Sequence, residues 1–412
     1  MVNCSGIFKR KYCLMPLHNI NNEYYNMSDY IVNPVTPDDY RYLAKKRLPR
    51  FLFEYIEGGA NDQITLSSNV NDFSQIKLKQ QVMRDVGDID TSTILLGQKS
   101  SMPLALAPIG MAGMMARRGE VQGARAAKAL GVPFTASTVG ICSVDEIQTA
   151  INSPFWFQLY MLRDRDVILS LLERAHNAGC NTLVFTVDLA VAGMRHADTR
   201  NGMLTKGLKS SLAKVYQLAT RPSWVADVAL QGRPLVFGNL TDVVADPNNL
   251  NSFKQFLDAQ FDPSVTWQDI TWLRSVWSGK LIIKGVMEVD DALAAVDAGA
   301  DAVLVSNHGG RQLDSVASSI SKLPAIVNAI GEQVEVYMDG GIRSGVDVVK
   351  AVALGAKGVF VGRPWICALA ARGEEGLKDQ LTIFQKEISV AMALMGVNKI
   401  EDISADMIDQ TF

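Results

Sequence analysis

The sequence of 412 residues is poor in cysteine and histidine and has no excess of positive charge. Its five cysteines are scattered without a CxxC pair, which argues against a disulfide framework or a zinc site and favours a reducing compartment. Forty basic residues against forty-three acidic ones give a net charge of −3, so no general positive field exists to hold nucleic acid. A disulfide-rich domain and a nonspecific DNA-binding protein are therefore excluded.

Uninterrupted apolar segments of the ~18 to 20 residues that span a bilayer are also missing, so we do not expect the chain to cross a membrane. A GxGxxG turn after a first strand and a P-loop are absent as well, which disfavours a nicotinamide dinucleotide fold. Residues 1–32 have no sustained apolar run that would indicate a signal peptide, and we interpret them as a loose N-terminal extension.

Eight short apolar runs follow residue 100 and alternate with segments of helical period. They cover residues 103–110, 133–138, 155–160, 182–188, 280–286, 302–308, 335–341 and 358–364. Continuous apolarity within a run indicates a strand covered on both faces, which is typical of a parallel sheet walled by helices. The sequence therefore predicts an α/β fold, a closed (β/α)₈ TIM barrel, with a doubly wound open sheet as the alternative.

About 90 residues (189–279) separate the fourth run from the fifth, far more than one helix needs. We therefore expect an insertion above the barrel mouth at about residues 196–279. Residues 36–100 precede the barrel and look helical. These parts are predicted to form one domain over residues 33–412.

The residues that close the predicted strands are unusually polar, and in a barrel the ligand site lies at these strand ends. Burying an ammonium, a carboxylate and an imidazole at one mouth costs several kcal/mol unless partners or a ligand compensate. The strand ends are therefore a candidate site. Its members are Gly110, Ser137, Gln158, Tyr160, Thr186, Asp188, Lys284, His308, Arg311, Asp339, Gly362 and Arg363.

The string SNHGGRQLD (306–314) is the strongest local signal. His308 ends its strand, two glycines let the backbone turn beside a ligand, and Arg311 then points a planar two-pronged donor into the same space. A histidine satisfied by core hydrogen bonds is the alternative, which the Gly-Gly-Arg context disfavours. Asp188 can hydrogen-bond an imidazole and stabilise its charged form, although taken alone it is equally an N-cap.

Lys284 and the last two strand ends indicate an anionic ligand. A buried ammonium needs an anionic partner, which is a carboxylate, a phosphate or a cofactor that becomes an anion. Glycine turns at 339–345 and 362–364 bring Arg343 and Arg363 to neighbouring strands, where barrels commonly bind phosphate. A phosphate-bearing ligand is therefore expected.

From about Leu48 to its C-terminus the chain resembles the FMN-dependent α-hydroxy-acid oxidising enzymes. The strings that carry the resemblance are LPRFLFEYIEGGA, APIGMAGMMARRGE, WFQLY, FTVD, IIKG, SNHGGRQLD and DGGIRSG with GVFVGRP. Within the family, APIGMAGMMARRGEV, TRPSWVADVALQGRP and QFDPSVTWQDITWLR are most similar to the quinone-linked bacterial L-lactate dehydrogenases. One departure is that some oxidases carry alanine at the position of Gly110.

The resemblance implies a role for each residue of the site. His308 would be the active-site base and Asp188 its orienting carboxylate. Arg195 and Arg311 would bind the substrate carboxylate. Tyr55 and Tyr160 would hydrogen-bond substrate oxygens. FMN would be held by Pro108, Ile109, Gly110, Ser137, Gln158, Thr186, Lys284, Asp339, Gly341, Arg343, Gly362 and Arg363.

The resemblance also implies oxidation of a small 2-hydroxy acid, L-lactate, with electrons passed to a quinone by a homotetramer at the cytoplasmic face of the inner membrane. Residues 200–235 hold six basic residues against one acid, with apolar residues between them, which favours peripheral contact with anionic lipid. A flexible lid or a subunit contact is the alternative there. Two other functions stay open: a soluble oxidase of lactate, glycolate or mandelate that uses O₂, and a barrel that binds a phosphate-bearing ligand without turnover.

Overall fold

The computed structural model describes residues 31, 33–201, 203, 207–244 and 260–409. The chain divides into two units, Met1–Pro34 and Val35–Phe412, and the second contains all the elements below. Nearly all of the predicted N-terminal extension lies outside the described residues, as do residues 202, 204–206 and 245–259 of the predicted insertion.

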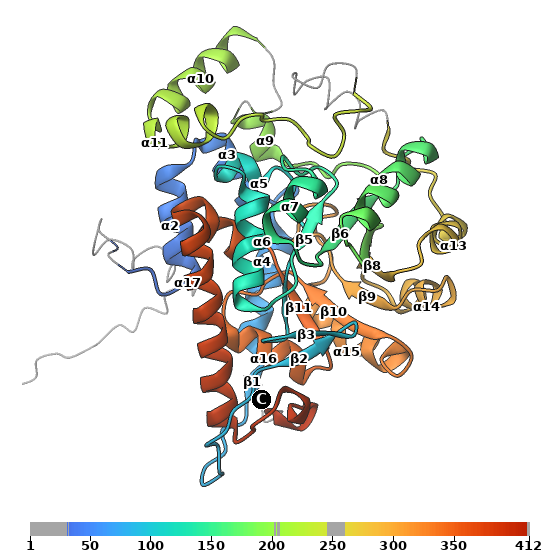
Figure 1. Ribbon diagram of the computed structural model, residues 1–412. Coiled ribbons are helices and arrows are strands. Elements are labelled where there is room, and N and C mark those ends of the chain that lie inside the picture. Colours follow the sequence, from blue (N-terminus) through green and yellow to red (C-terminus); the bar gives the residue numbers. More distant parts are fainter. Residues whose placement is uncertain (1–30, 32, 202, 204–206, 245–259, 410–412) are drawn as a thin grey trace, which may run out of the picture. The chain divides into compact units, whose positions relative to one another are not determined.

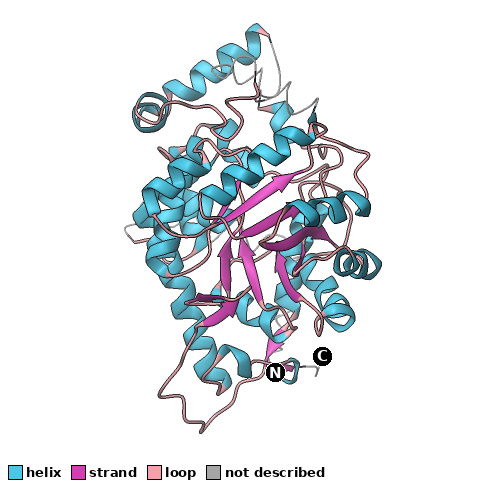
Figure 2. Cartoon of the chain, turned by 45° about the vertical axis from the view of Figure 1, so that its right-hand side comes forward, coloured by secondary structure: helices cyan, strands magenta, loops and turns pink. Residues whose placement is uncertain are grey.

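Eight parallel strands form one sheet in the order β4, β11, β10, β9, β8, β7, β6, β5. A parallel bridge between Leu106 and Phe134 closes the sheet into a barrel, which helices surround in Figure 2. The strands are β4 (Leu104–Leu106), β5 (Thr135–Ser137), β6 (Trp156–Tyr160), β7 (Thr182–Thr186), β8 (Lys280–Val286), β9 (Ala302–Val305), β10 (Glu335–Asp339) and β11 (Gly358–Val361). Each lies within one predicted run. The TIM-barrel prediction is confirmed, and the open-sheet alternative is wrong.

At least one helix follows each strand, and eight helices of the described residues cover the outside of the barrel; the last of them has a kink at Arg372 and Gly373. These helices are α6 (Gly119–Leu130), α7 (Val144–Ile151), α8 (Arg165–Asn177), α13 (Trp267–Val276), α14 (Val289–Asp297), α15 (Ser319–Ile330), α16 (Gly345–Ala353) and α17 (Arg363–Met395). Several begin at a side-chain oxygen that accepts a backbone N–H of the first turn, namely in Ser143, Asp164, Ser318 and Ser344. Each helix turns an apolar stripe toward the strands.

Large side chains fill the interior of the barrel. The ring of Phe360 lies 5.6 Å from that of Trp156 and 5.7 Å from that of Tyr337, and all three side chains are fully buried. At the end of the barrel where the strands begin, the hairpin of β2 (Thr93–Leu95) and β3 (Gln98–Ser100) packs Leu95 and Leu96 against the interior side chains. Because these side chains fill the interior, the inside of the barrel has no room for a ligand, and a site is expected at the mouth.

The segment before the barrel is helical only in its first part. The helices α2 (Pro37–Arg47), α3 (Arg50–Glu57), α4 (Ile64–Asn71) and η3 (Asp72–Gln75) agree with the expectation for residues 36–100. The expectation is wrong from Lys77 onward, where β1 (Lys77–Leu78), β2 and β3 form. Leu96 and Gly97 both have positive φ angles, which is the turn that a two-residue hairpin requires and a helix cannot accommodate.

The extra segment after β7 contributes α9 (His196–Arg200), α10 (Leu208–Ala219), α11 (Pro222–Trp224) and η4 (Val225–Leu230). We call α10, α11 and η4 the insertion helices; Figure 1 shows α10 and α11 at its top. They are tied to the N-terminal helices, because Arg221 Nε donates to Leu48 O at 3.0 Å and Asp227 pairs with Arg47.

The remaining elements are α5 (Ala112–Met115), η5 (Ile400–Asp402), η6 (Ala405–Met407) and β12 (Ile408–Asp409), which pairs with β1. Among the helices of the described residues, none combines the length and the apolar character that crossing a membrane requires.

Candidate active site

Most of the predicted site residues line one cavity of about 690 Å³ at the barrel mouth, a volume typical of small-molecule and cofactor sites. The lining includes Tyr55, Pro108, Ile109, Gly110, Tyr160, Thr186, Arg195, Lys284, His308, Arg311, Asp339, Gly341, Arg343, Gly362 and Arg363. Ser137, Gln158 and Asp188 are not part of the lining. They lie in or just after β5, β6 and β7; Ser137 accepts the N–H of Val139 and Asp188 contacts His308, both of which line the cavity, and Gln158 is bonded to Ser137.

His308 and Asp188 form a pair across two strand ends. Nδ1 of His308, just after β9, lies 2.7 Å from Oδ1 of Asp188, just after β7. This bond favours the tautomer protonated at Nδ1 and leaves Nε2 as the basic nitrogen. His308 has a positive φ of 58°, rare for a residue with a side chain, and its N–H donates to Ser306 Oγ at 3.0 Å. The arrangement is that of a base with its orienting carboxylate.

Lys284 is buried in the last part of β8, with 5% of its surface exposed. Its Nζ lies 3.0 Å from Oδ2 of Asp339 and donates to Ser306 Oγ at 2.7 Å. Burial alone lowers the pKa of Lys284, but Asp339 and Asp188 outweigh burial and raise the pKa above its ordinary value. The ammonium therefore stays charged and places one positive charge at the centre of the mouth.

Asp188 is expected to contribute to stability only above acidic pH. Burial alone raises its pKa, but His308 and Lys284 outweigh burial, so its pKa lies below the ordinary value of 3.8. A carboxyl group with a lowered pKa in the folded state stabilises the protein above pH 3.8, and that contribution is lost as the pH falls through the lowered pKa. Thermal unfolding should therefore show a Tm difference between the wild type and Asp188→Asn that narrows below pH 3.8. A difference that widens on acidification would contradict this pairing.

Arg311 and Arg195 lie around the ring of Tyr55, with their guanidinium carbons 4.9 and 5.6 Å from the ring centre. Nη1 of Arg311 donates to the carbonyls of Tyr55 and Gly58, and Nε of Arg195 lies 2.9 Å from Oδ2 of Asp198. Burial and the neighbouring Arg195 lower the pKa of Arg311. Two guanidinium groups held this closely favour the binding of an anion.

Tyr160 ends β6 and lines the cavity together with Tyr55. Its ring stands edge-on to Phe261, with the ring centres 5.4 Å apart. Burial raises the pKa of the Tyr160 phenol, and Asp188 adds to the increase. The phenol therefore stays protonated and can donate a hydrogen bond to an oxygen of a ligand in the cavity.

The segment Pro108 to Gly110 follows β4 and forms another wall. A Cβ atom on Gly110 would lie 2.7 Å from Cγ2 of Val139 and 3.6 Å from the Tyr55 hydroxyl. Glycine therefore lets the backbone lie close to these two side chains, and the alanine that some oxidases carry here would require Val139 to move.

Four buried polar atoms at the strand ends have no hydrogen-bond partner among the described residues: Gln158 Nε2, Thr186 Oγ1, Asp188 Oδ2 and Asp339 Oδ1. The Gln158 amide is oriented by Ser137 Oγ, which donates to its Oε1 at 3.1 Å. An unpaired buried polar group costs about 1–3 kcal/mol. A ligand with a complementary polar edge would remove these costs.

The ends of β10 and β11 form a glycine-rich corner of the cavity. Gly341 has a φ of 85°, and a Cβ atom there would lie 1.8 Å from Asn69 O, so only glycine fits. Gly362 is the N-cap of α17 and is open toward the cavity, with no atom closer than 4.0 Å to a Cβ built on it. Free amides at a helix start and a nearby arginine, Arg343, are the groups that bind phosphate.

The side chain of Arg363 makes contacts that the sequence does not predict. Its three guanidinium nitrogens donate to the carbonyls of Ile56, Gly58 and Gly309 at 3.0 to 3.2 Å. These bonds tie the end of α3 to the loop that carries His308. These bonds use three of the five guanidinium N–H groups, so a contact of Arg363 with phosphate stays a prediction for the two remaining ones and for its backbone N–H.

Besides Asp198, which pairs with Arg195, four further residues support the site and were not predicted from the sequence. Asn69 and Asn307 exchange two hydrogen bonds of 2.8 Å and hold α4 against the His308 loop. Gln312 Nε2 donates to the carbonyls of Asp188 and Val191 and holds the loop after β7. The fourth is Ser306. Three of the four belong to SNHGGRQLD, but apart from His308, which bonds Ser306, their partners lie too far away in the sequence to be recognised.

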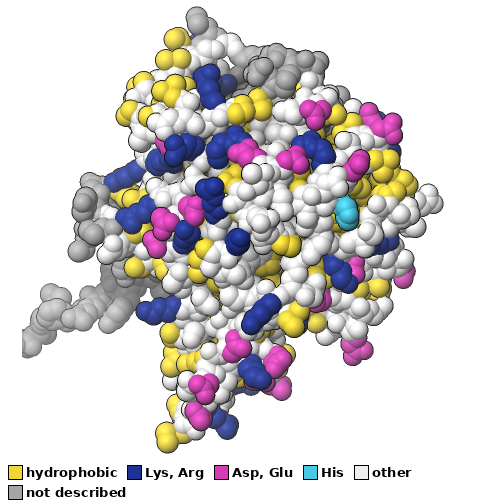
Figure 3. Space-filling view, viewed as in Figure 1, with side chains coloured by type: hydrophobic (Ala, Val, Ile, Leu, Met, Phe, Trp, Pro, Cys, Tyr) yellow, Lys and Arg dark blue, Asp and Glu magenta, His cyan; other side chains and the backbone are white. Residues whose placement is uncertain are grey.

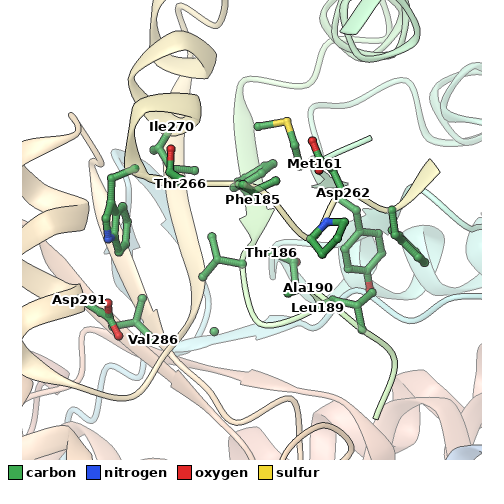
Figure 4. A pocket seen from close by; sticks show the side chains of 17 residues that line it. Met161, Phe185, Thr186, Leu189, Ala190, Asp262, Thr266, Ile270, Val286 and Asp291 are labelled. Atoms are coloured by element: carbon green, nitrogen blue, oxygen red, sulfur yellow. The ribbon is translucent and has the colours of Figure 1, made fainter. Parts of the chain in front are cut away.

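A second cavity of about 420 Å³ lies between β7, β8 and α13 (Figure 4). Its walls are mostly apolar, and Asp262 and Asp291 are the only charged residues in the lining. Because it has no cationic group, this cavity does not suit a carboxylate or a phosphate. It shares Tyr160, Thr186, Leu189 and Phe261 with the larger cavity.

Comparisons with known proteins agree on one family. The model of the FMN-dependent dehydrogenases matches residues 44–410. L-lactate dehydrogenase of Azorhizobium caulinodans is 50% identical over 371 residues, which are 90% of this chain and 97% of the relative. That of Alcaligenes faecalis is 48% identical over 370 residues, 90% of this chain and 97% of the relative.

Solved structures of two hydroxy-acid oxidising enzymes are also similar to this chain. The monotopic membrane protein (S)-mandelate dehydrogenase superposes with a TM-score of 0.86 at 34% identity, covering 92% of this chain and 99% of that structure. A mandelate oxidase superposes with a TM-score of 0.77 at 34% identity, covering 92% of this chain and 98% of that structure.

Proposed function

Because the chain belongs to the FMN-dependent dehydrogenase family, as its motifs predicted, we propose that it oxidises L-lactate to pyruvate and passes the electrons to a quinone. Lactate as the substrate is supported by relatives named L-lactate dehydrogenase at 48% to 50% identity. The observation that carries the proposal is the single cavity in which the His308 base, the Lys284 ammonium and two arginines converge. A barrel without turnover does not fit this family of oxidoreductases.

The residues at the mouth fit FMN. FMN supplies a flat ring that accepts two electrons, passes them on and carries negative charge when reduced. Gln158 and Thr186 offer unpaired polar atoms for the polar edge of the ring, and the Lys284 ammonium stabilises an added negative charge. The glycine-rich corner at Gly341 and Gly362, with Arg343, suits the phosphate.

The remaining residues of the cavity act on the hydroxy acid. Arg195 and Arg311 bind its carboxylate, and the phenols of Tyr55 and Tyr160 bind its oxygens. His308 accepts one proton from the substrate at Nε2, and Asp188 stabilises the imidazolium that forms. These roles need one cationic site that binds the carboxylate, one base and one electron acceptor, and the cavity has room and residues for all three.

Replacing Arg311 with lysine is expected to lower kcat/KM for L-lactate by about 10- to 150-fold, mainly through KM. The reason is that a charge-assisted hydrogen bond contributes about 1.5–3 kcal/mol and that lysine has no fork to match a carboxylate. Steady-state kinetics measure the change. Arg125→Lys, on the exposed surface of α6, is the matched control and should behave like the wild type. An unchanged KM in the Arg311 variant would exclude it from carboxylate binding.

The substrate proposal is tested by mixing the purified flavoprotein with hydroxy acids under anaerobic conditions. L-lactate should bleach the flavin absorbance, whereas D-lactate and glycolate should not. Bleaching by glycolate or mandelate in preference to L-lactate would reassign the substrate within the family. Failure of every 2-hydroxy acid to bleach would end the proposal.

The acceptor is tested separately, because the alternative is an oxidase that uses O₂. Reoxidation of the reduced enzyme by a short-chain quinone should be much faster than reoxidation by air, and little hydrogen peroxide should form. Stoichiometric peroxide, with no stimulation by quinone, would favour the oxidase.

Helix α10 supports peripheral binding to a membrane, where quinone resides. None of its described side chains is buried, and Leu212, Val215 and Tyr216 are exposed to 61%, 63% and 72% on neighbouring turns. Figure 3 shows hydrophobic side chains in this region at the upper left. Lys209 on the same helix supplies positive charge for anionic lipid. We propose contact with the cytoplasmic face of the inner membrane.

Replacing both Leu212 and Tyr216 with serine is expected to weaken binding to anionic vesicles at least about tenfold. Each apolar side chain that leaves water contributes about 1.5–3 kcal/mol when fully buried. Vesicle cosedimentation measures the effect. Val82→Ser is the matched control, because Val82 is 72% exposed but lies in the loop before β2. Equal loss of binding in both variants would rule out α10 as the contact.

The homotetramer expected from the family resemblance stays a prediction. Light scattering on the purified protein measures the assembly directly. A monomer would make the exposed face of α10 available on every copy, and a subunit contact over α10 would refute membrane binding through it.

A further inference from the structure

Besides its charged residues, the larger cavity has an apolar part, which lies between α3, α5 and the insertion helices. We call this part the annex and define it by the lining residues Phe51, Leu52, Met111, Met114, Trp224 and Phe237. They come from α3, from the β4–α5 connection and α5, and from the extra segment after β7. The hydroxy acid and FMN, which need cations and hydrogen bonds, do not account for this apolar part.

Several walls of the annex are buried side chains. Leu52, Trp224 and Phe237 have only 1%, 5% and 6% of their surfaces exposed. The indole Nε1 of Trp224 donates to Met114 O at 2.8 Å, so the polar atom of this side chain is satisfied and its ring is left as an apolar wall. Two methionines add polarisable thioethers that adapt to a flat ring.

The inner end of the annex begins beside the expected flavin. Met111 directly follows Gly110, the last residue of the segment expected to contact FMN. Met111 has a positive φ of 60°, and its N–H donates to Val139 O at 3.0 Å, which holds it at the cavity wall. A molecule in the annex would therefore lie next to the ring that must be reoxidised.

The outer end of the annex leads to α10. Lys214 of α10 lines the same cavity, while Leu212, Val215 and Tyr216 on the same helix are exposed. Helix α10 is joined to the annex wall, because Gln217 Oε1 accepts the N–H of Phe51 at 3.0 Å. Figure 1 shows α11 close to α3 and α5, and contacts between α5 and η4 agree with this arrangement.

We propose that the annex binds the ring of the quinone acceptor, which enters from the side of α10. This inference rests on the proposed function and names the place where its second substrate binds. A quinone ring is flat, uncharged and apolar on both faces, which matches the annex, whereas a carboxylate would lose its hydration there without enough cations to replace it. The quinone takes up two electrons and two protons, the number that the hydroxy acid loses on becoming the 2-oxo acid, and leaves as the quinol.

The first test is photolabelling of the holoenzyme with an azidoquinone, followed by peptide mass spectrometry. Labels are expected on peptides that contain Phe51, Met111, Met114 or Trp224. Labels confined to the second cavity, on Met161, Phe185 or Trp267, would move the acceptor site there and overturn the proposal. Labels scattered over the surface would overturn it as well.

The second test separates the two half-reactions by stopped flow. Met114→Gln keeps the length of a half-buried side chain but adds an amide, and it should slow reoxidation by a short-chain quinone about tenfold. Bleaching by L-lactate and reoxidation by ferricyanide should stay as in the wild type. Met114→Leu, which stays apolar, is the matched control and should react with quinone normally.

These outcomes distinguish the inference from the proposed function. If L-lactate fails to bleach the flavin, the proposed substrate is wrong, and photolabelling still reports whether quinone binds in the annex. If bleaching is normal but Met114→Gln reacts with quinone like the wild type and is labelled to the same extent, the annex is not the acceptor site.

Discussion

Replacing His308 with alanine is expected to lower kcat for L-lactate by about 10²- to 10⁴-fold, the contribution of a positioned general base. Bound FMN should survive, because His308 contacts Asp188 and Ser306 rather than the glycine-rich corner proposed for the phosphate. The measurement is single-turnover bleaching together with the flavin absorbance of the purified variant. Since the base acts on the substrate, KM should change much less than kcat.

The control for this prediction is His176→Ala. His176 is exposed on α8, where its ring stands edge-on to Trp277, and it lies outside the lining of the cavity. Its replacement should leave turnover unchanged. Normal turnover in the His308 variant would refute the assignment of the base. A colourless His308 variant would show instead that His308 serves the cofactor site.

Replacing Lys284 with methionine is expected to destabilise the protein by about 3–5 kcal/mol, the usual effect of removing one partner of a buried ion pair. Lys284 and Asp339 are both largely buried, and methionine would leave the Asp339 carboxylate without its ammonium partner. Lys284 also helps to lower the pKa of Asp188, so the Asp188 carboxylate would lose the favourable interaction with the same ammonium. Reduced FMN, which carries negative charge, should also bind less tightly.

Denaturant unfolding of FMN-free protein measures this effect, because bound FMN adds its own stabilisation. The double variant Lys284→Met with Asp339→Asn removes both charges and should recover most of the loss. If Lys284→Met alone is as stable as the wild type, Lys284 and Asp339 do not stabilise the fold as an ion pair. A double variant less stable than the single one would show that Asp339 acts through another partner.

The architecture of this protein was largely predictable from its sequence. Each strand of a barrel is covered on both faces, so it appears as a short continuous apolar run, and all eight runs contain a strand. The hairpin at Thr93–Ser100 was missed because its strands have three residues each and carry no such run. Its turn at Leu96 and Gly97 became evident only from the backbone.

The members of the candidate site were predictable for a related reason. Parallel strands of one barrel place their C-terminal ends at one mouth, so polar residues that end different strands must converge. His308 and Asp188 are 120 residues apart in the chain, and their Nδ1 and Oδ1 atoms lie 2.7 Å apart. The topology alone brings them together.

The orientation of the side chains was not predictable in the same way. Arg363 was expected at a phosphate, yet its guanidinium group donates to the carbonyls of Ile56, Gly58 and Gly309. Asp198 was not expected at all, and it pairs with Arg195. These partners depend on which loop passes over the mouth, and no periodic pattern in the sequence records that.

The sequence by itself determined the barrel, its family and the set of groups at its mouth, because strand burial and short motifs are local properties of the chain. Only the tertiary structure decided which of these groups pair with one another and which face an open cavity. It also showed that the insertion helices are fastened to α3 and cover an apolar annex, with Phe51 and Trp224 about 170 residues apart along the chain. Contacts of that kind follow from the packing of side chains across loops, which is fixed by shape and hydrogen bonding in three dimensions.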